Sequence, residues 1–184
     1  DALSEVTINE DDPEQTVNLT GITAGGGEIQ VLSVAAVSDN SGLIPDPTVT
    51  YSSADSTGTL KFTPVADQFG TATITVTVED GGLDNDLATP EDNGVMNRTV
   101  FVAVAPVNDD PTLDELSEST LIEDFGTSTV QLTGITAGPN ETQDVRVTAV
   151  SSDTNLVTIG EVQYPASSWM NSGRVAHYPL NDTS

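Results

Sequence analysis

Residues 71–78 read TATITVTV, a strict alternation of Thr with Ala, Ile or Val. Successive side chains of a β-strand point to opposite faces, so this segment has one polar and one apolar face and predicts a half-buried strand. Residues 100–104 read VFVAV and place Val at every second position, which predicts another strand. Together the two segments favour an antiparallel sheet with one solvated face.

Turn-rich segments divide the first part of the chain into short stretches of this kind. We expect strands at about residues 3–9, 15–20, 29–37, 47–53, 58–63, 71–79 and 97–106. No stretch has the apolar period and the capping signals of an amphipathic helix. Seven short strands in about 100 residues are typical of a β-sandwich with Greek-key connections. The expected fold class is therefore all-β.

The sequence also repeats itself over a long period. Residues 3–44 and 116–157 align without a gap and share 22 identities in 42 positions. The aligned stretch contains the heptapeptide LTGITAG, at residues 19–25 and again at 132–138. Self-similarity at a fixed long period indicates tandem copies of one domain.

We therefore expect a β-sandwich repeat at residues 1–107, an acidic linker at 108–111 and a second repeat at 112–184. Prolines on both sides of the linker make it short and stiff. After a two-residue insertion, residues 173–180 align with 58–65, and the sequence ends where the first copy enters its sixth strand. The second repeat is thus expected to lack its last two strands and to be marginally stable unless another chain supplies them.

Composition narrows the range of partners. The chain has 29 Asp and Glu residues against 4 Lys and Arg, a formal net charge of −25. Because a phosphate backbone is bound through clustered cations, this balance argues against a nucleic-acid partner. No apolar run approaches the roughly 18 residues needed to cross a bilayer, so no membrane contact by this segment is expected. The absence of Cys excludes disulfides, thiolate zinc sites and Cys nucleophiles.

Some of the acids recur at equivalent positions of the two copies. The pair Glu-Asp at residues 10–11 returns at 123–124, and Asp67 returns as Asp182. Ca²⁺ takes six to eight oxygen ligands and tolerates irregular loops. Acids grouped in loops therefore indicate calcium binding, whereas acids scattered over the surface would indicate solubility or adaptation to salt. Both kinds of acid are present.

Several motifs resemble those of cadherin domains. Residues 107–111, VNDDP, resemble the linker DxNDNxP, and residues 80–82, DGG, resemble the corner after the sixth strand. Glu10 resembles the lone Glu before the second strand, Asp67 the Asp of the LDRE motif, and Asp153 stands where cadherins carry a DxD loop. Essentially the whole chain is similar to the bacterial cadherin-like (immunoglobulin-like) tandem repeats of very long surface and secreted proteins.

This resemblance implies Ca²⁺ between successive repeats. Inside this chain it implies an oxygen ligand set made of Glu10 with its neighbour Asp11, Asp67, Asn108, Asp109, Asp110 and Asp153. Towards a preceding repeat it implies Asp39 and Asp80. Carboxylates that repel one another keep such a joint flexible until cations bridge them, so calcium is expected to stiffen the array.

The expected function is a non-catalytic structural or adhesive module of a bacterial extracellular or cell-surface array. Its expected partners are neighbouring repeats and a cell-surface protein or polysaccharide. The alternative is a carbohydrate-binding or spacer module of a secreted polysaccharide-acting enzyme, although aromatics make up only 4 % of the chain. Catalysis is not expected, because a Ser/His/Asp site would need the single His177, whose counterpart in the first copy is Phe62.

Overall fold

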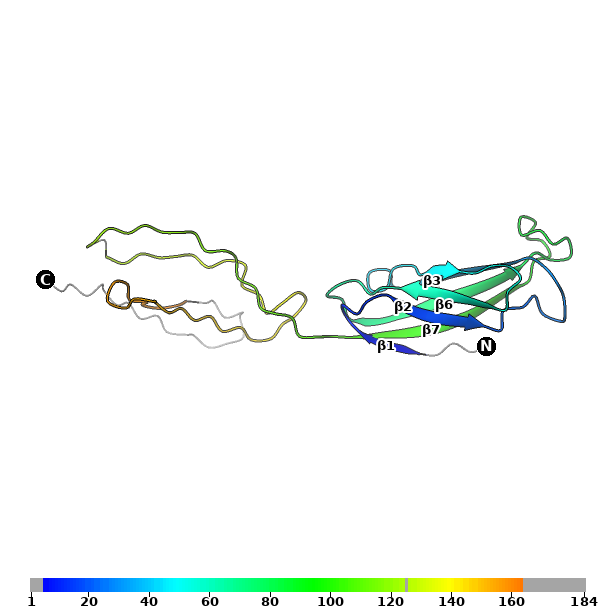
Figure 1. Cartoon of the computed structure of the whole chain (residues 1–184), viewed down its shortest axis with the longest axis horizontal. Helices are drawn as coiled ribbons and strands as arrows, with labels where there is room; N and C mark the ends of the chain where they lie inside the picture. The colour runs from blue at the N-terminus through cyan, green and yellow to red at the C-terminus, as the bar shows by residue number, and fades with distance from the viewer. Residues whose placement is uncertain (1–4, 125, 164–184) are drawn as a thin grey trace. The chain divides into compact units, whose positions relative to one another are not determined.

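The computed structural model describes residues 5–124 and 126–163 and divides the chain into two compact units (Figure 1). Unit 1 is Asp1–Val107 and unit 2 is Asn108–Ser184. The described residues contain strands and turns but no helix. The all-β prediction is therefore confirmed for the described part of the chain.

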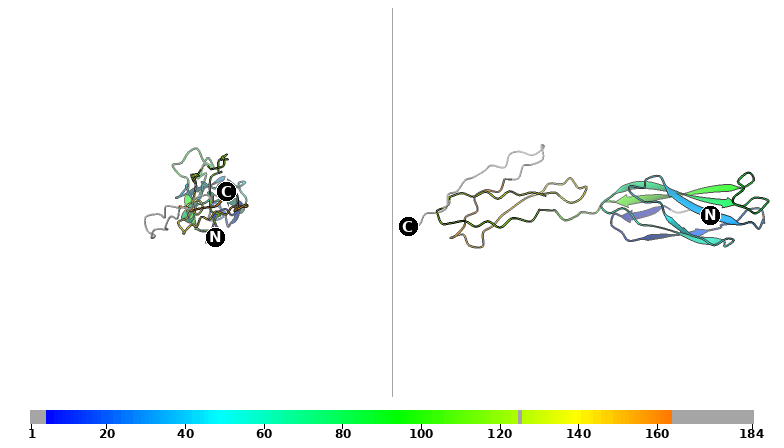
Figure 2. Two further views of the ribbon diagram at one scale, coloured as in Figure 1. Left: turned by 90° about the vertical axis from the view of Figure 1, so that its left-hand side faces the viewer. Right: turned by 90° about the horizontal axis from the view of Figure 1, so that it is seen from above.

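Unit 1 contains the named strands. They are β1 (Val6–Asn9), β2 (Gln15–Thr20), β3 (Leu32–Ser38), β4 (Thr48–Thr50), β5 (Thr57–Phe62), β6 (Gly70–Asp80) and β7 (Val95–Ala105). They form a four-stranded sheet in the order β1-β7-β6-β3 and a three-stranded sheet in the order β2-β5-β4. Figure 2 shows the strands of unit 1 in two further views. Two sheets with a shared core are consistent with a β-sandwich.

The long antiparallel pair β6–β7 follows the alternation of the sequence. Its register places Ile74 opposite Val100 and Ala72 opposite Val102. Most apolar members of the alternation are at most 4 % exposed, and the last one of β6, Val78, is half-buried against the same core. The members at most 4 % exposed are Ala72, Ile74, Val76, Val100, Val102 and Val104. One face of this sheet therefore forms a wall of the core, as the period of two predicts.

The core is completed by side chains from the second sheet and from a loop. Leu60 of β5 and Ile44 of the β3–β4 loop are 0 % exposed and join the same cluster as Ile74 and Val100. Burying one such side chain contributes about 1.5–3 kcal/mol relative to leaving it exposed. Apolar burial between the two sheets is thus the main stabilising interaction of unit 1.

The starts of β3 and β7 differ from the expected ones for local reasons. β3 begins at Leu32 and not near residue 29, because residues 25–27 form a glycine turn with positive φ and Ile29 stays 92 % exposed. β7 begins earlier than expected, at Val95, because the N–H of Asp80 donates to the carbonyl of Gly94 at 3.0 Å and extends the ladder. The β6–β7 connection is correspondingly shorter.

β1 pairs with β7 in parallel, and only along residues 102–105 of β7. Figure 1 shows the short β1 beside one part of the much longer β7. Along residues 95–101, β6 is the one strand that pairs with β7 among the described residues. One edge of β7 therefore has no described partner strand over this stretch.

The described residues of unit 2, 108–124 and 126–163, contain turns and one isolated bridge, between Thr112 and Thr136, but no strand. One local hydrogen bond occurs at equivalent positions of the two aligned segments. The N–H of Glu28 donates to the carbonyl of Gly25, and that of Glu141 donates to the carbonyl of Gly138. Several expectations concern residues outside the described part of the chain, namely those for the aligned segment 173–180, Asp182 and His177. The prediction that the second repeat lacks its last two strands also concerns residues outside that part.

Candidate metal centre

Glu10 is a buried carboxylate directly after β1. Its N–H donates to the carbonyl of Ala105 at 2.9 Å, which continues the β1–β7 ladder by one bond. Its Oε1 accepts the N–H of Val107 at 2.7 Å, so the side chain holds the chain where it leaves β7. The residue is 4 % exposed, and its second oxygen, Oε2, is buried without a hydrogen-bond partner. A buried carboxylate oxygen of this kind is costly unless a cation or a donor reaches it.

Asp11 and Asp67 lie beside each other although they are far apart in sequence. The N–H of Asp67, in the loop before β6, donates to Oδ1 of Asp11 at 3.0 Å. Both residues adopt the left-handed conformation, with φ of 64° and 57°. Asp and Asn tolerate this region better than other side-chain-bearing residues do. The backbone of both turns therefore suits the Asp residues that the sequence places there.

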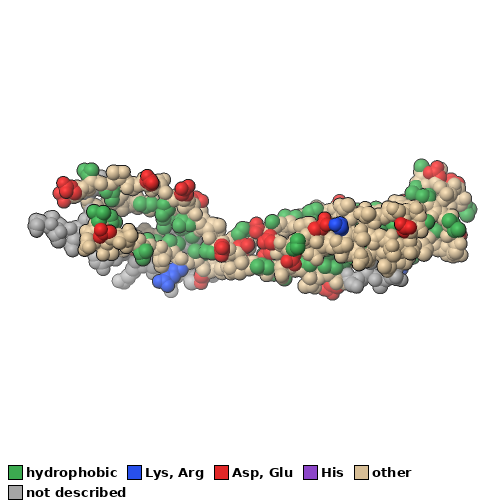
Figure 3. Space-filling model, viewed as in Figure 1, with side chains coloured by type: hydrophobic (Ala, Val, Ile, Leu, Met, Phe, Trp, Pro, Cys, Tyr) green, Lys and Arg blue, Asp and Glu red, His purple; other side chains and the backbone are tan. Residues whose placement is uncertain are grey.

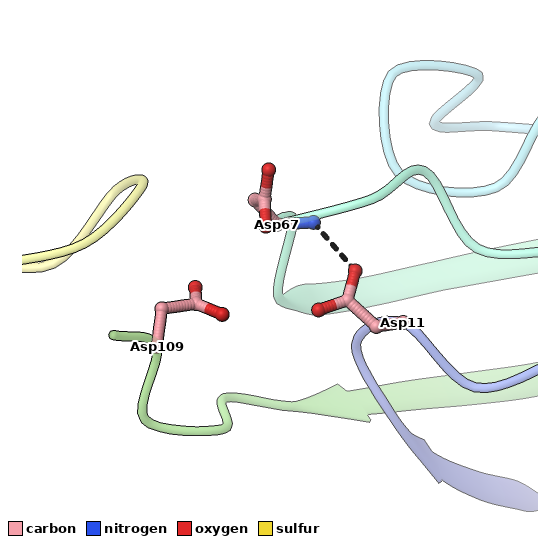
Figure 4. A group of neighbouring side chains, drawn as sticks. All are labelled: Asp11, Asp67 and Asp109. Atoms are coloured by element: carbon pink, nitrogen blue, oxygen red, sulfur yellow. Dashed lines mark hydrogen bonds between the residues drawn. The ribbon is translucent and has the colours of Figure 1, made fainter. Parts of the chain in front are cut away.

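Asp109 is the third member of an acidic group. It follows the end of β7 on the segment between the two prolines, and its N–H donates to Oε1 of Glu141 at 3.0 Å. Each of these residues offers one carboxylate oxygen, and the three oxygens, from Asp11, Asp67 and Asp109, lie within 4.8 Å of one another. Figure 4 shows the three side chains around one space, with the hydrogen bond from Asp67 to Asp11. Asp11 is exposed, and the other two are half-buried.

This donor set consists entirely of oxygens. Carboxylate oxygens suit hard cations such as Ca²⁺ and Mg²⁺, whereas zinc prefers His and Cys ligands. On the face of the molecule in Figure 3, Asp and Glu side chains outnumber Lys and Arg side chains. Lys61, the lysine of unit 1, forms an ion pair with Glu14 at 2.6 Å. The chemistry of the group therefore fits a divalent cation with oxygen ligands.

The other residues expected at this site are placed differently. Asn108 donates from Nδ2 to the carbonyl of Asp109 at 2.8 Å and accepts from Gln143 at 2.8 Å. Asp110 is exposed and does not belong to the group of three. Oδ1 of Asp153 accepts the N–H groups of Asn155 and Leu156, at 3.0 and 3.3 Å, and so caps its own turn. None of these three side chains is part of the described acidic group.

The expectation that Asp39 and Asp80 face one neighbouring repeat together is wrong. β3 and β6 pair with Leu32 opposite Asp80 and Ser38 opposite Ile74. Asp39 follows Ser38, and its Oδ1 accepts the N–H of Thr73 at 2.7 Å. The two acids therefore lie towards opposite ends of the β3–β6 pair, roughly 20 Å apart at about 3.3 Å per residue. Sequence motifs alone did not reveal the separation of the two acids, because it depends on the register of the β3–β6 pair.

Asp80 has a structural role at the start of the β6–β7 connection. Its Oδ1 accepts the N–H groups of Gly82 and Gly94, at 3.0 and 2.8 Å. These backbone donors, that of Gly94 first, hold the pKa of the Asp80 carboxyl below its ordinary value, because they favour the charged form. The side chain closes the loop across its own two ends.

Sequence reasoning missed Glu141, which accepts the N–H of Asp109. The available signal was its recurrence, since Glu141 aligns with Glu28 between the two copies. Glu141 lies outside the motifs that carried the resemblance.

Comparison with family models, with curated proteins and with solved structures finds no match to this chain. The resemblance to cadherin-like repeats therefore stays a prediction from the sequence. Among the described residues, no helix has the length and apolar character to cross a membrane.

Proposed function

We propose that this chain is a non-catalytic structural or adhesive module of an extracellular repeat array, and that Ca²⁺ bound by its loop acids stiffens the chain between repeats. The observation that carries the proposal is the acidic group of Asp11, Asp67 and Asp109, with carboxylate oxygens within 4.8 Å of one another. Like charges gathered in this way repel one another, and a divalent cation converts the repulsion into attraction.

The residues that would hold the ion are those whose oxygens face the group. Asp11, Asp67 and Asp109 offer carboxylates, and Glu10, next in sequence to Asp11, has a buried oxygen without a hydrogen-bond partner. Calcium usually completes its six to eight ligands with backbone carbonyls and water. Because Asp109 lies beyond the last strand of unit 1, an ion held by all three carboxylates would restrict the segment that follows that strand.

The assignment to a Greek-key, cadherin-like or immunoglobulin-like tandem repeat is part of the same proposal. It is supported by the alignment of 22 identities in 42 positions. It is also supported by equivalent backbone conformations: Asp11 and Asp124 have φ of 64° and 59°, and Gly21 and Gly134 have φ of 71° and 67°. Residues 113 positions apart thus share both their identity and a left-handed conformation.

Thermal unfolding of the full chain, with calcium and with a chelator, tests the proposal. Binding to the native state alone stabilises by about 2.7 kcal/mol at a hundredfold excess of ligand over Kd. We expect calcium to raise the melting temperature of unit 1 by several degrees, a rise of the size that such a stabilisation gives. An unchanged melting temperature at millimolar calcium would contradict the metal proposal.

A matched pair of variants locates the effect. Asp67→Asn removes one carboxylate of the group and should abolish most of the calcium-induced shift. Glu91→Gln removes one charge from the exposed β6–β7 connection and should leave the shift unchanged. An equal loss in both variants would mean that calcium acts through general screening of the negative charge and not at this group.

A further inference from the structure

Unit 2 begins with a short segment that is hydrogen-bonded to the repeated heptapeptide LTGITAG of the same unit. The N–H of Thr112 donates to the carbonyl of Thr136 at 3.1 Å, and its Oγ1 donates to the carbonyl of Gly134 at 2.6 Å. The N–H of Asp114 donates to the carbonyl of Thr133 at 2.9 Å. The start of unit 2 is thus docked along its own heptapeptide.

Two side chains that follow the heptapeptide hold the acidic linker at the beginning of this segment. Oε1 of Glu141 accepts the N–H of Asp109 at 3.0 Å, and Gln143 donates from Nε2 to Oδ1 of Asn108 at 2.8 Å. Gly138 permits a close approach of the linker, because a Cβ at that position would lie 2.7 Å from Cβ of Asp109. Within unit 2 the linker is therefore bound by a carboxylate, an amide and a glycine.

Unit 1 contains the same groups, 113 residues earlier in the sequence. The equivalent residues are the heptapeptide at 19–25, Glu28 in place of Glu141, and Gln30 in place of Gln143. The hydrogen bond from the N–H of Gly25 to Oγ1 of Thr23, 3.3 Å long, recurs with the same length in unit 2. These groups lie within residues 21–30, the docking loop of unit 1.

The two copies differ in how far these groups are covered. In unit 2, Gly138 is buried and Glu141 is half-buried, whereas the equivalent Gly25 and Glu28 are exposed. A Cβ at Gly25 would meet no atom within 4 Å. Among the residues that the structure describes, none is hydrogen-bonded to the carboxylate of Glu28, and Oε1 of Gln30 is buried without a partner. Unit 1 thus presents, in a more exposed form, the groups that bind the acidic linker in unit 2.

We propose that, within the repeat array of the proposed function, on which this inference rests, the docking loop binds the linker of a preceding repeat with the pattern Asn-Asp-Asp-Pro-Thr. Glu28 accepts the N–H of the first Asp of that linker. Gln30 donates one amide N–H to the carbonyl of Gly82 at 2.7 Å, and its second N–H donates to the Asn. The carbonyl groups of Gly21 and Thr23 accept the hydroxyl and the N–H of the Thr, as their equivalents do in unit 2.

A second copy of this chain is a poorer source of the linker. Its own acidic linker is already bonded to its unit 2 through Glu141 and Gln143. Two chains of net charge −25 also repel each other. A linker that is covalently connected to unit 1 reaches the docking loop at a high effective concentration, which offsets this repulsion.

A chain with a short extension, studied in chelator, tests this inference. The extension repeats residues 107–113, VNDDPTL, directly before Asp1, because residues 1–5, DALSE, align with residues 114–118, DELSE. We expect the amide of its first Asp to exchange about tenfold more slowly than in an extension of the same composition in scrambled order, since it gains an acceptor. Residue-resolved hydrogen exchange by NMR measures the difference. Equal exchange in the ordered and the scrambled extension would overturn the inference.

Two variants of the extended chain locate the binding. Glu28→Ala removes the acceptor and should return the Asp amide to the exchange rate of the scrambled extension. Glu91→Ala removes an exposed Glu of the β6–β7 connection and should leave the protection unchanged. Protection that survives Glu28→Ala, or that is lost equally in both variants, would overturn the role of the docking loop.

A third variant checks the bond in unit 2 that serves as the template. In the chain without an extension, Glu141→Ala should accelerate exchange at the Asp109 amide by a similar factor. Unchanged exchange there would remove the template and overturn the inference as well. Because calcium is absent from all these measurements, their outcome is independent of the calcium-induced shift in melting temperature that tests the proposed function.

Discussion

The N–H of Asp67 donates to Oδ1 of Asp11 at 3.0 Å, which ties the loop before β6 to the turn after β1. The same two residues contribute carboxylate oxygens to the acidic group with Asp109. The hydrogen bond gives Asp11 a structural role even without a cation, because it holds two loops at the same end of unit 1. Substitutions at Asp11 can therefore separate loop stability from ion binding.

Asp11→Asn and Asp11→Ala should behave differently in the absence of calcium. Asn keeps an acceptor for the N–H of Asp67 and tolerates the φ of 64°, whereas Ala loses the acceptor and fits that conformation poorly. We expect Asp11→Ala to lower the free energy of unfolding by about 1–3 kcal/mol and Asp11→Asn to lower it little. Urea unfolding of both variants in chelator measures the difference. Equal stability of the two would show that neither the bond nor the turn conformation matters.

Glu10→Gln and Glu10→Ala test how the buried side chain holds the end of β7. Gln retains an oxygen that can accept the N–H of Val107, while Ala leaves that donor without the acceptor seen at 2.7 Å. We expect Glu10→Ala to cost about 1–3 kcal/mol of stability, and Glu10→Gln to cost less in chelator. Hydrogen exchange at the Val107 amide provides a local readout, since exchange should accelerate in Glu10→Ala only.

The sequence predicted those parts of the fold that depend on local patterns. The Thr-Val alternation of residues 71–78 predicted both the strand and its buried face, and each of the expected strands has a counterpart. Pairing across the chain was not predictable in this way. The parallel contact of β1 with residues 102–105 of β7 depends on how the strands assemble, and nothing in the sequence of β1 encodes it locally.

The candidate site was likewise predictable from the sequence only in part. Asp11, Asp67 and Asp109 could be named because acids recur in loops and resemble a known motif, and the structure brings their oxygens together. Asp39 was misplaced because its position depends on the β3–β6 register, which residue identity does not reveal.

Acidification should reveal the contribution of Asp80. Its pKa is lowered in the folded state by the N–H groups of Gly94 and Gly82, so its charged form stabilises the fold. This stabilisation is present above the unfolded-state pKa of about 3.9 and is lost as the pH falls through the lower folded-state value. Asp80→Asn should therefore be less stable than the wild type at neutral pH, and the difference should shrink below about pH 4. Urea unfolding at both pH values measures it, and a difference that grows on acidification would contradict the assigned direction.

Ile74→Ala and Thr75→Ala test the two faces of β6. Ile74 is 0 % exposed in the core, so its truncation removes apolar contacts and leaves a cavity. We expect a loss of about 2–5 kcal/mol, which is large compared with the total stability of a small domain. Thr75 is the next residue on the same strand, but its side chain lies on the opposite face, outside the core cluster. Thr75→Ala should cost less than about 1 kcal/mol, the span of strand propensities. Equal losses in urea unfolding would mean that both faces of this sheet are packed, contrary to the alternation on which the fold was predicted.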